Sequence, residues 1–411
     1  MTKWLTLAWR DLWRNRRRSF ISMSAIAFSV FIISLANSLQ TGTYDSMEEI
    51  AVRLFPGDIQ VQSKGYFDDK SLNRSLTDGQ VDYAAFPEQF AAINAVARRI
   101  TGFGLASADS SSAGAMILGI EPEFEAQITT FSTKIFEGEA LTDGDVQSVL
   151  LGHILARNLG AGIGDTVVVI TQGFRNAMGA DLYTVKGTLR TGTTDVDRSL
   201  MVMPLAASQY LFSMEGRYTE LVVGTNDLRA STRTANAIAA TVNAEEVDVL
   251  SWRELIPDLQ QTRALDDAGN YIFYAFLILL VSFEIFNTTM MSVMERVREY
   301  GVMMAIGVRP YQISMIVTFE LILKVIIGIL AGLLIVGTLV FFLKDNPIQL
   351  PPEMTQMYEE LGFTIGGISF AARPGLFVFP VVAVLAAGLV STIYPILRLR
   401  TFSPVEALRT D

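Results

Sequence analysis

The sequence predicts a membrane protein with four transmembrane helices and a large α+β extracytoplasmic domain between the first and the second. Of its 411 residues, 50% are hydrophobic and only 18% are charged, which excludes a disordered chain and argues against a single soluble globule. Four apolar stretches each reach the roughly 20 residues that a helix needs to cross the core of a bilayer. The charges are also segregated, because residues 41–270 hold 31 acidic and 17 basic side chains and the rest hold 11 and 15.

Basic residues flank the four predicted spans at alternate ends, and this sets their orientation. The spans are residues 19–44, residues 268–294, the segment from 310 to 343 and the segment between Arg373 and Arg398. Arginines cluster before the first span, between the second and third, and after the fourth, and Lys and Arg resist translocation. We therefore expect both termini in the cytoplasm. The alternative for the first span, a cleaved signal peptide, is disfavoured because the apolar run is too long.

These spans divide the chain into segments with distinct expected roles. In order, they are a cytoplasmic amphipathic helix (1–18), the first transmembrane helix with an external stalk (19–55), the extracytoplasmic α+β domain (56–251), a stalk and the second transmembrane helix (252–299), a cytoplasmic coupling segment (300–312), the third transmembrane helix (313–343), an external loop (344–374), the fourth transmembrane helix (375–397) and a cytoplasmic tail (398–411). In a helix over residues 3–17, Arg10 and Arg14 would lie on one side and Ala8 and Leu12 largely on another. This pattern predicts a helix lying on the membrane surface.

The first two spans are predicted to continue as helices beyond the membrane. Apolar residues keep a helical spacing from Leu35 to Leu54, and Pro56-Gly57 then ends the pattern. A return helix from Pro257 to Glu299 would be roughly 60 Å long, about twice the thickness of the bilayer core. We expect the surplus to form an external stalk.

Between the stalk segments the pattern changes to short strands separated by turns. We expect strands at 59–62, 115–120, 147–152, 165–171, 182–190, 199–203 and 219–224, and helices at 84–99, 153–160, 205–214 and 229–243. This alternation is typical of an α+β domain.

The composition excludes several classes of function. The chain has no cysteine and one histidine, His153, so thiolate metal sites and histidine-based triads are excluded. It contains no Gly-Lys dipeptide and hence no phosphate-binding G-x-x-x-x-G-K-[ST] loop. The acidic region disfavours binding to nucleic acid. We therefore expect no catalytic residues, no metal and no cofactor of its own, so that any ATP is bound by a partner.

The connection between the second and third spans carries the most informative pattern. Glu295, Arg296, Arg298 and Glu299 can pair at helical spacing and end the long helix in water. We expect a turn at Gly301 and a short apolar helix from 302 to 306, closed by Gly307. The alternative is an ordinary helix exit with positive-inside charges.

This connection resembles the E-R-x-R-E-x-G-x-x-x-A-x-G sequence of FtsX-like, MacB-type and Lol-type permeases of ABC transporters. Residues 8–19 (AWRDLWRNRRRS) and the C-terminal Tyr394-Pro395 with 403–409 (SPVEALR) resemble two further motifs of that family, so the likeness covers the whole chain. The resemblance implies that the ATPase-coupling residues are Glu295, Arg296, Arg298, Glu299, Gly301, Ala305 and Gly307.

The resemblance also implies partners and a mechanism. Two permeases, identical or different, would bind two ATPase subunits in a bacterial inner membrane and transmit ATPase closure mechanically to the external domains. Stretches such as 57–66 (GDIQVQSKGY) resemble the Lol-type branch, which extracts lipoproteins. The hairpin 172–181, where that branch can carry a loop that recruits a periplasmic chaperone, lacks proline. The alternatives are a non-transporting regulator of an external partner and MacB-type efflux of peptides or drugs.

Four polar residues inside the predicted spans are candidates for a role in the membrane. Glu320 and Lys324 are four residues apart and predict an ion pair within one helix. Glu284 has no such partner, so it is either a functional carboxyl group or a neutral one bonded to a neighbouring span. Asn287 is expected to form hydrogen bonds between helices.

Overall fold

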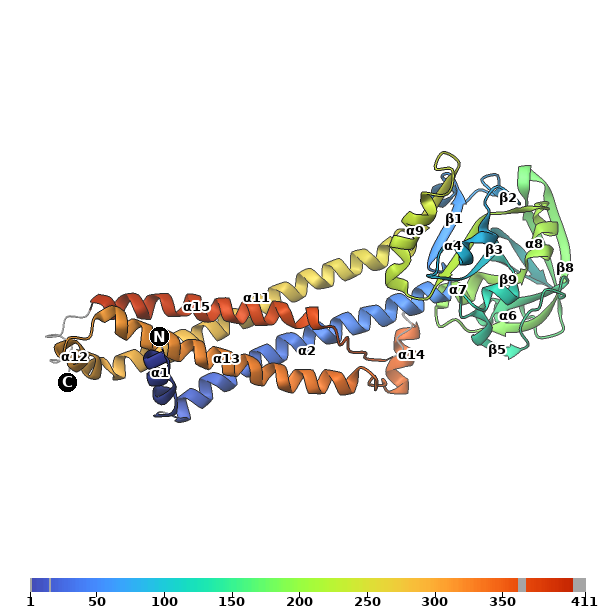
Figure 1. Cartoon of the computed structure of the whole chain (residues 1–411). Coiled ribbons are helices and arrows are strands. Elements are labelled where there is room, and N and C mark those ends of the chain that lie inside the picture. The colour runs from blue at the N-terminus through green and yellow to red at the C-terminus, as the bar shows by residue number, and fades with distance from the viewer. Residues whose placement is uncertain (1, 15, 361–366, 402–411) are drawn as a thin grey trace. The chain divides into compact units, whose positions relative to one another are not determined.

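The computed structural model describes residues 2–14, 16–360 and 367–401, which form two compact units (Figure 1). The first unit is helical and comprises residues within 1–44, 262–349 and 367–411. The second unit contains the sheet and comprises residues within 45–261 and 350–366. The C-terminal motif at 403–409 lies outside the described residues.

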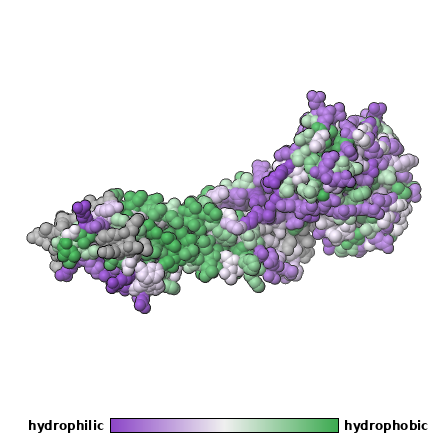
Figure 2. All heavy atoms as spheres, in the orientation of Figure 1, coloured by the Kyte–Doolittle hydropathy of each residue, from purple (hydrophilic) through white to green (hydrophobic). Residues whose placement is uncertain are grey.

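The first unit is a helical bundle with four helices long and apolar enough to cross a membrane among the described residues. Its elements are α1 (Thr2–Arg14), the greater parts of α2 (Arg16–Leu54) and α11 (Pro257–Glu295), α12 (Val297–Ala305), α13 (Pro310–Leu343), the 3₁₀ turn η5 (Pro374–Phe377) and α15 (Val378–Thr401). Figure 2 shows apolar side chains gathered around the middle of this bundle. Helices α2 and α11 have 39 residues each, which makes both about 58 Å long.

One apolar core joins the four long helices of the bundle. Val30 of α2, Ile285 of α11, Val325 of α13 and Val384 of α15 are buried in the same cluster. Helices α2 and α13 approach closely, because a Cβ atom on Gly332 would lie 2.6 Å from the carbonyl oxygen of Ala27. A second glycine, Gly328, stands four residues earlier on α13, and this spacing of small residues permits close contact between membrane helices.

Helix α1 packs one face against the bundle, because Ala8 and Leu12 are fully buried within the protein. Trp9 and Trp13 remain exposed on the same helix. The return helix ends earlier than predicted, at Glu295 and not at Glu299, because Arg296 leaves the helical conformation.

The second unit contains a ten-stranded sheet, part of which closes on itself. Its strands are β1 (Ile59–Ser63), β3 (Ile93–Ala108), β4 (Ser111–Ile120), β5 (Ile135–Gly138), β6 (Ser148–Gly152), β7 (Thr166–Gln172), β8 (Met178–Leu189), β9 (Leu200–Pro204), β11 (Glu220–Thr225) and β12 (Val247–Ser251). Strands β3, β4, β9, β6, β8 and β7 pair in a closed ring, since β7 pairs with both β8 and β3. The pairs β4–β9 and β6–β8 are parallel, and the other pairs are antiparallel.

Short helices surround the sheet, and a separate strand pair lies beside it. The pair is β2 (Leu76–Thr77) with β10 (Arg217–Tyr218). The helices are α3 (Tyr66–Asp69), α4 (Phe86–Gln89), α5 (Pro122–Glu125), α6 (His153–Leu159), α7 (Thr194–Ser199), α8 (Leu205–Phe212), α9 (Ser231–Ala239), α10 (Trp252–Leu255) and α14 (Pro352–Glu360), with 3₁₀ turns η1 (Tyr83–Ala85), η2 (Phe131–Thr133), η3 (Phe174–Asn176) and η4 (Leu228–Ala230).

The structure confirms the seven predicted strands and three of the four predicted helices to within a few residues. The helix predicted at 84–99 is wrong, because its second half belongs to the 16-residue strand β3. This strand pairs with β4 along one edge and with β11 and β7 along the other. Pairing with distant strands therefore overrides the alanine-rich, helix-like composition of the segment.

A buried ion pair holds β3 to α5. The side chain of Arg99 is fully buried and that of Glu125 is 2% exposed. Arg99 Nε donates to Glu125 Oε2 at 3.0 Å, and its Nη1 donates to the carbonyl oxygen of Phe55 at 2.6 Å. Removal of one partner would leave the other charge buried without compensation.

We expect Arg99→Met to lower the free energy of unfolding by about 3–5 kcal/mol, because Glu125 would lose its buried partner. The neighbouring Arg98 provides a matched control, since its side chain is 25% exposed and pairs with Glu121 and Asp78. Arg98→Met should cost about 1 kcal/mol. Thermal unfolding of the purified full chain measures both, and equal losses would contradict the assigned role of Arg99.

Candidate functional site

The candidate site is the connector, defined as residues 296–309 between α11 and α13. Its helix α12 begins where Arg296 adopts φ −106° and ψ 9°. The helix ends at Ala305, and Gly307 then closes it with a φ of +100° that suits glycine, while the Val308 amide donates back to the Met303 carbonyl at 3.0 Å. The connector is therefore a folded element with a defined start and end.

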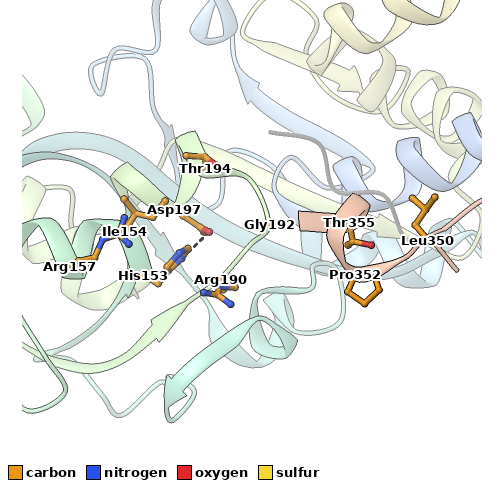
Figure 3. Close-up of a pocket in the computed structure, with 10 residues that line it drawn as sticks. All are labelled: His153, Ile154, Arg157, Arg190, Gly192, Thr194, Asp197, Leu350, Pro352 and Thr355. Carbon is orange, nitrogen blue, oxygen red and sulfur yellow. Dashed lines mark ion pairs between the residues drawn. The ribbon is translucent and has the colours of Figure 1, made fainter. Parts of the chain in front are cut away.

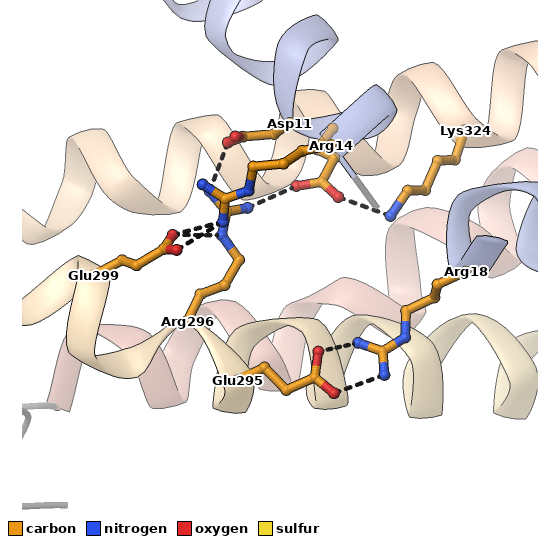
Figure 4. Close-up of polar contacts among 8 residues, drawn as sticks. Asp11, Arg14, Arg18, Glu295, Arg296, Glu299 and Lys324 are labelled. Carbon is orange, nitrogen blue, oxygen red and sulfur yellow. Dashed lines mark hydrogen bonds and ion pairs between the residues drawn. The ribbon is translucent and has the colours of Figure 1, made fainter. Parts of the chain in front are cut away.

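Arg296 is the centre of an ion network at this end of the bundle (Figure 4). Its Nη2 donates to Asp11 Oδ2 of α1 at 2.6 Å, and its Nη1 donates to Glu320 Oε2 of α13 at 3.3 Å. Its Nε donates to Glu299 Oε2 of α12 at 3.2 Å. The side chain is only 15% exposed, so these three carboxylates replace most of its water.

Two further arginines of the N-terminal helices pair with glutamates at this end of the bundle. Arg14 joins the network through Glu299, whereas Arg18 and Glu295 form a separate pair between α2 and α11. Arg14 Nη2 contacts both oxygens of Glu299 at 2.8 Å, and Arg18 Nη2 donates to Glu295 at 2.7 Å. The hydrogen bonds from these arginines lower the pKa of Glu299 and of Glu295 below the ordinary glutamate value. The pairs therefore add stability above about pH 4.3, and this stability is lost as the pH falls through the lowered pKa values.

The network is balanced in charge. The three acidic members are Asp11, Glu299 and Glu320, and the three basic members are Arg14, Arg296 and Lys324. They come from α1, α12, α13 and the residue between α11 and α12, and Lys324 Nζ completes the set by donating to Glu320 at 2.7 Å. These contacts fix the connector to the bundle.

Helix α12 has one buried face and one exposed face. Val297, Tyr300 and Gly301 are buried, and Tyr300 packs with Val293, Ile313 and Val317. Arg298, Val302 and Ala305 recur at helical spacing on the exposed face. Beyond the helix, Ile306 is 77% exposed, which is unusual for so large an apolar side chain.

Two predictions about the connector are wrong. Gly301 does not form a turn, because it lies buried inside α12 and the chain turns at Arg296. The charged residues do not pair mainly with one another, since only Arg296 and Glu299 do so and Arg298 is exposed outside the network. The predicted closure of the short helix at Gly307 is confirmed.

The polar residues of the long helices behave partly as expected. The Glu320–Lys324 ion pair within α13 is confirmed, and Arg296 joins it from outside. Glu284 Oε1 accepts a hydrogen bond at 3.0 Å from Thr288 of its own helix, so its bonded partner is not on a neighbouring span. Its other carboxyl oxygen is buried without a partner among the described residues. Asn287 is exposed.

Asp11 and Arg14 were not predicted as partners of the connector, nor was Arg18 as the partner of Glu295. A usable signal was present for Asp11, since it is the only acidic residue among the first 44 and stands three positions after the buried Ala8. An acidic group on the apolar face of a helix indicates a buried cationic partner.

No group of three or more metal-ligating side chains occurs among the described residues.

Comparison with known families matches both parts of the chain. Residues 19–241 match the family model of the MacB-like periplasmic core domain, and residues 271–404 match that of the FtsX-like permease C-terminal region. The lipoprotein-releasing system transmembrane protein LolC of Neisseria meningitidis serogroup B is 24% identical over 423 residues, covering 97% of this chain and 96% of that protein. LolC of Xylella fastidiosa (strain Temecula1) is 24% identical over 307 residues, covering 72% and 73%. An uncharacterized ABC transporter permease of Methanocaldococcus jannaschii is 23% identical over 286 residues.

Solved structures with some likeness cover about half of the chain. The periplasmic region of MacB from Actinobacillus actinomycetemcomitans has a TM-score of 0.36 and 17% identity, covering 53% of this chain and 97% of that structure. The extracellular domain of the transporter YknZ from Gram-positive bacteria has a TM-score of 0.35 and 15% identity, covering 47% and 99%.

We expect Arg296→Gln to destabilise the bundle by about 3 kcal/mol, because Asp11 and Glu320 would each lose a cationic partner in a largely buried site. Arg298→Gln is the matched control, two residues away and exposed, and should change stability by less than about 0.5 kcal/mol. Thermal unfolding of the full chain in detergent compares the two. A wild-type transition for Arg296→Gln would show that the network contributes little.

Proposed function

Because the chain belongs to the FtsX/MacB/Lol-type family of ABC transporter permeases, we propose that it is the membrane subunit of a lipoprotein-releasing exporter in the bacterial inner membrane. The single observation that carries this proposal is the similarity to a LolC protein over nearly the whole length of both chains. The energy comes from a separate ATPase, which is the arrangement of an ABC permease that has no phosphate-binding loop of its own.

The complex contains two permeases and two ATPase subunits. The arginine-rich end of the bundle and both termini face the cytoplasm, and the acidic second unit faces outward. The distribution of basic residues along the chain supports this orientation. The substrate is an amphiphile taken from the outer leaflet, so it need not pass through the centre of the bundle.

The exposed face of the connector is the surface that receives the ATPase. Arg298, Val302 and Ile306 offer one charge and two apolar side chains outside the protein core. The opposite face is bound to α1 and α13 through Arg296 and Glu299, so a displacement of the connector moves these helices with it. Helices α2 and α11 then transmit the motion, since each is about 58 Å long and nearly twice as long as the bilayer core is thick.

The release reaction can be tested with the permease and its ATPase reconstituted in proteoliposomes that contain an acylated lipoprotein. We expect ATP to release the lipoprotein into solution in the presence of an acceptor protein, and no release without ATP. Immunoblotting of the supernatant after sedimentation measures this. If the permease stimulates ATP turnover but no lipoprotein is released, the chain is instead a non-transporting regulator of an external partner. If a soluble peptide or drug is released in place of the lipoprotein, the chain is a MacB-type efflux permease.

The coupling role of the connector can be tested with Val302→Asp and Ile306→Asp. We expect each to reduce permease-stimulated ATP turnover at least about tenfold, because a charge in an apolar contact costs more than 1.4 kcal/mol. Met178→Asp is the matched control, since Met178 is 85% exposed in the second unit. If the connector variants fold, bind the ATPase and stimulate it normally, the docking surface lies elsewhere.

A further inference from the structure

The second unit contains a cavity of about 800 Å³ to which the proposed coupling gives no role. His153, Ile154 and Arg157 of α6 line one side together with Arg190, which follows β8 (Figure 3). Leu350 and Pro352, at the start of α14, line the side across from Arg157. All of these residues belong to the same compact unit.

Two guanidinium groups border this cavity without a carboxylate partner among the described residues. They belong to Arg157 and Arg190, which are both exposed. The Arg190 guanidinium lies over the ring of Phe136, 4.2 Å from its centroid, and the Phe136 ring is 6.0 Å from that of His153. Stacking on Phe136 therefore keeps Arg190 near the imidazole. Unpaired guanidinium groups bind phosphate oxygens through several charge-assisted hydrogen bonds.

The carboxylate of Asp197 also borders the cavity, but it is already occupied. Its side chain is 2% exposed, and one oxygen accepts hydrogen bonds from the Thr191 amide at 2.9 Å and the Thr191 hydroxyl at 2.7 Å. The other oxygen lies 3.1 Å from Nδ1 of His153. Asp197 is therefore engaged by Thr191 and faces the imidazole, and the two arginines are left to meet a ligand.

The side of the cavity across from Arg157 is formed by Leu350, Pro352 and Thr355, and the Thr355 hydroxyl already donates to the carbonyl oxygen of Pro351 at 3.3 Å. Leu350 is partly buried and Pro352 is exposed, and neither side chain offers a polar atom to a ligand. Ile154 adds apolar surface beside Arg157. A small hydrated anion would use the arginines alone, whereas a ligand with an anionic head and an apolar part would use both sides.

The geometry points to a binding site for a phosphate-bearing amphiphile in this cavity. Its phosphate group lies against Arg157 and Arg190, and its apolar part lies against Leu350 and Pro352. The source of the phosphate is either a phospholipid headgroup or free phosphate, and the apolar surface of Leu350 and Pro352 favours the phospholipid. This site is separate from the connector and does not depend on the ATPase.

His153 is the only histidine in the chain and therefore reports on the cavity by itself. The experiment measures the rate at which diethylpyrocarbonate modifies His153 in the full chain, carried in uncharged detergent with a histidine-free tag, by mass spectrometry of its peptide. The probes are dihexanoyl phosphatidylglycerol, dihexanoyl phosphatidylcholine and inorganic phosphate at constant ionic strength. We expect phosphatidylglycerol to slow the reaction roughly tenfold at about ten times its Kd, because about one site in ten is then free. Phosphate and phosphatidylcholine should protect more weakly.

Arg157→Gln/Arg190→Gln should abolish the protection, which is measured for each variant as the ratio of its own rates with and without probe. Arg175→Gln is the matched control, because Arg175 also stacks on an aromatic ring of this unit but lies outside the cavity. Replacement of both cavity arginines by lysine should keep part of the protection, since the charge remains and the planar fork is lost. The site would be overturned if none of the three probes protected His153. It would also be overturned if the double glutamine variant were protected as well as the wild type. Phosphate that protects as well as phosphatidylglycerol would overturn the amphiphile.

Discussion

The contacts of Arg296 determine how the connector is held, and the rest of the candidate site depends on them. One guanidinium group reaches carboxylates of α1, α12 and α13, at the residue where α11 ends and α12 begins. Because the group is largely buried, its charge requires compensation by close partners. The residue at which α11 ends is therefore also the residue whose charge is neutralised by three carboxylates. The connector is thus bound to the bundle at its first residue, Arg296.

A second constraint comes from the length of α2 and α11. A bilayer core accommodates roughly 20 residues of helix, and each of these helices has 39. Beyond the apolar stretch, polar contacts join the two helices. Gln40 Nε2 donates to Asp267 at 2.9 Å, and the hydroxyl of Tyr44 donates to Asp266. Ser38 of α2 also donates to the carbonyl oxygen of Ala371 at 2.8 Å. The first two contacts join α2 to α11 beyond the apolar stretch, and the third joins α2 to the segment that precedes η5.

The features that could be predicted from the sequence are those encoded by local patterns. Apolar length, basic flanks and the alternation in short strands such as β1 and β7 depend on residues close together in the chain. The path of β3 was not predictable in this way, because its partners β7 and β11 come from residues 166–172 and 220–225. The closed ring of strands depends on the same distant pairing. Local composition in residues 93–99 favours a helix, and only the completed sheet reverses that preference.

The charged residues of the candidate site were predicted from the sequence, but the residues with which they pair were not. The pairing depends on which of these residues are buried. Spacing alone allowed Glu295, Arg296, Arg298 and Glu299 to pair locally, yet the structure joins Glu295 and Glu299 to arginines 277 and 285 residues away. The buried positions Val293, Val297 and Tyr300 define a stripe along the connection. Arg296 lies three residues after Val293 and four before Tyr300, so it falls on this stripe, whereas Arg298 does not. A charged residue on a buried stripe needs partners from other elements. The difference between Arg296, which anchors the connector, and Arg298, which stays exposed, therefore follows from the apolar residues around them.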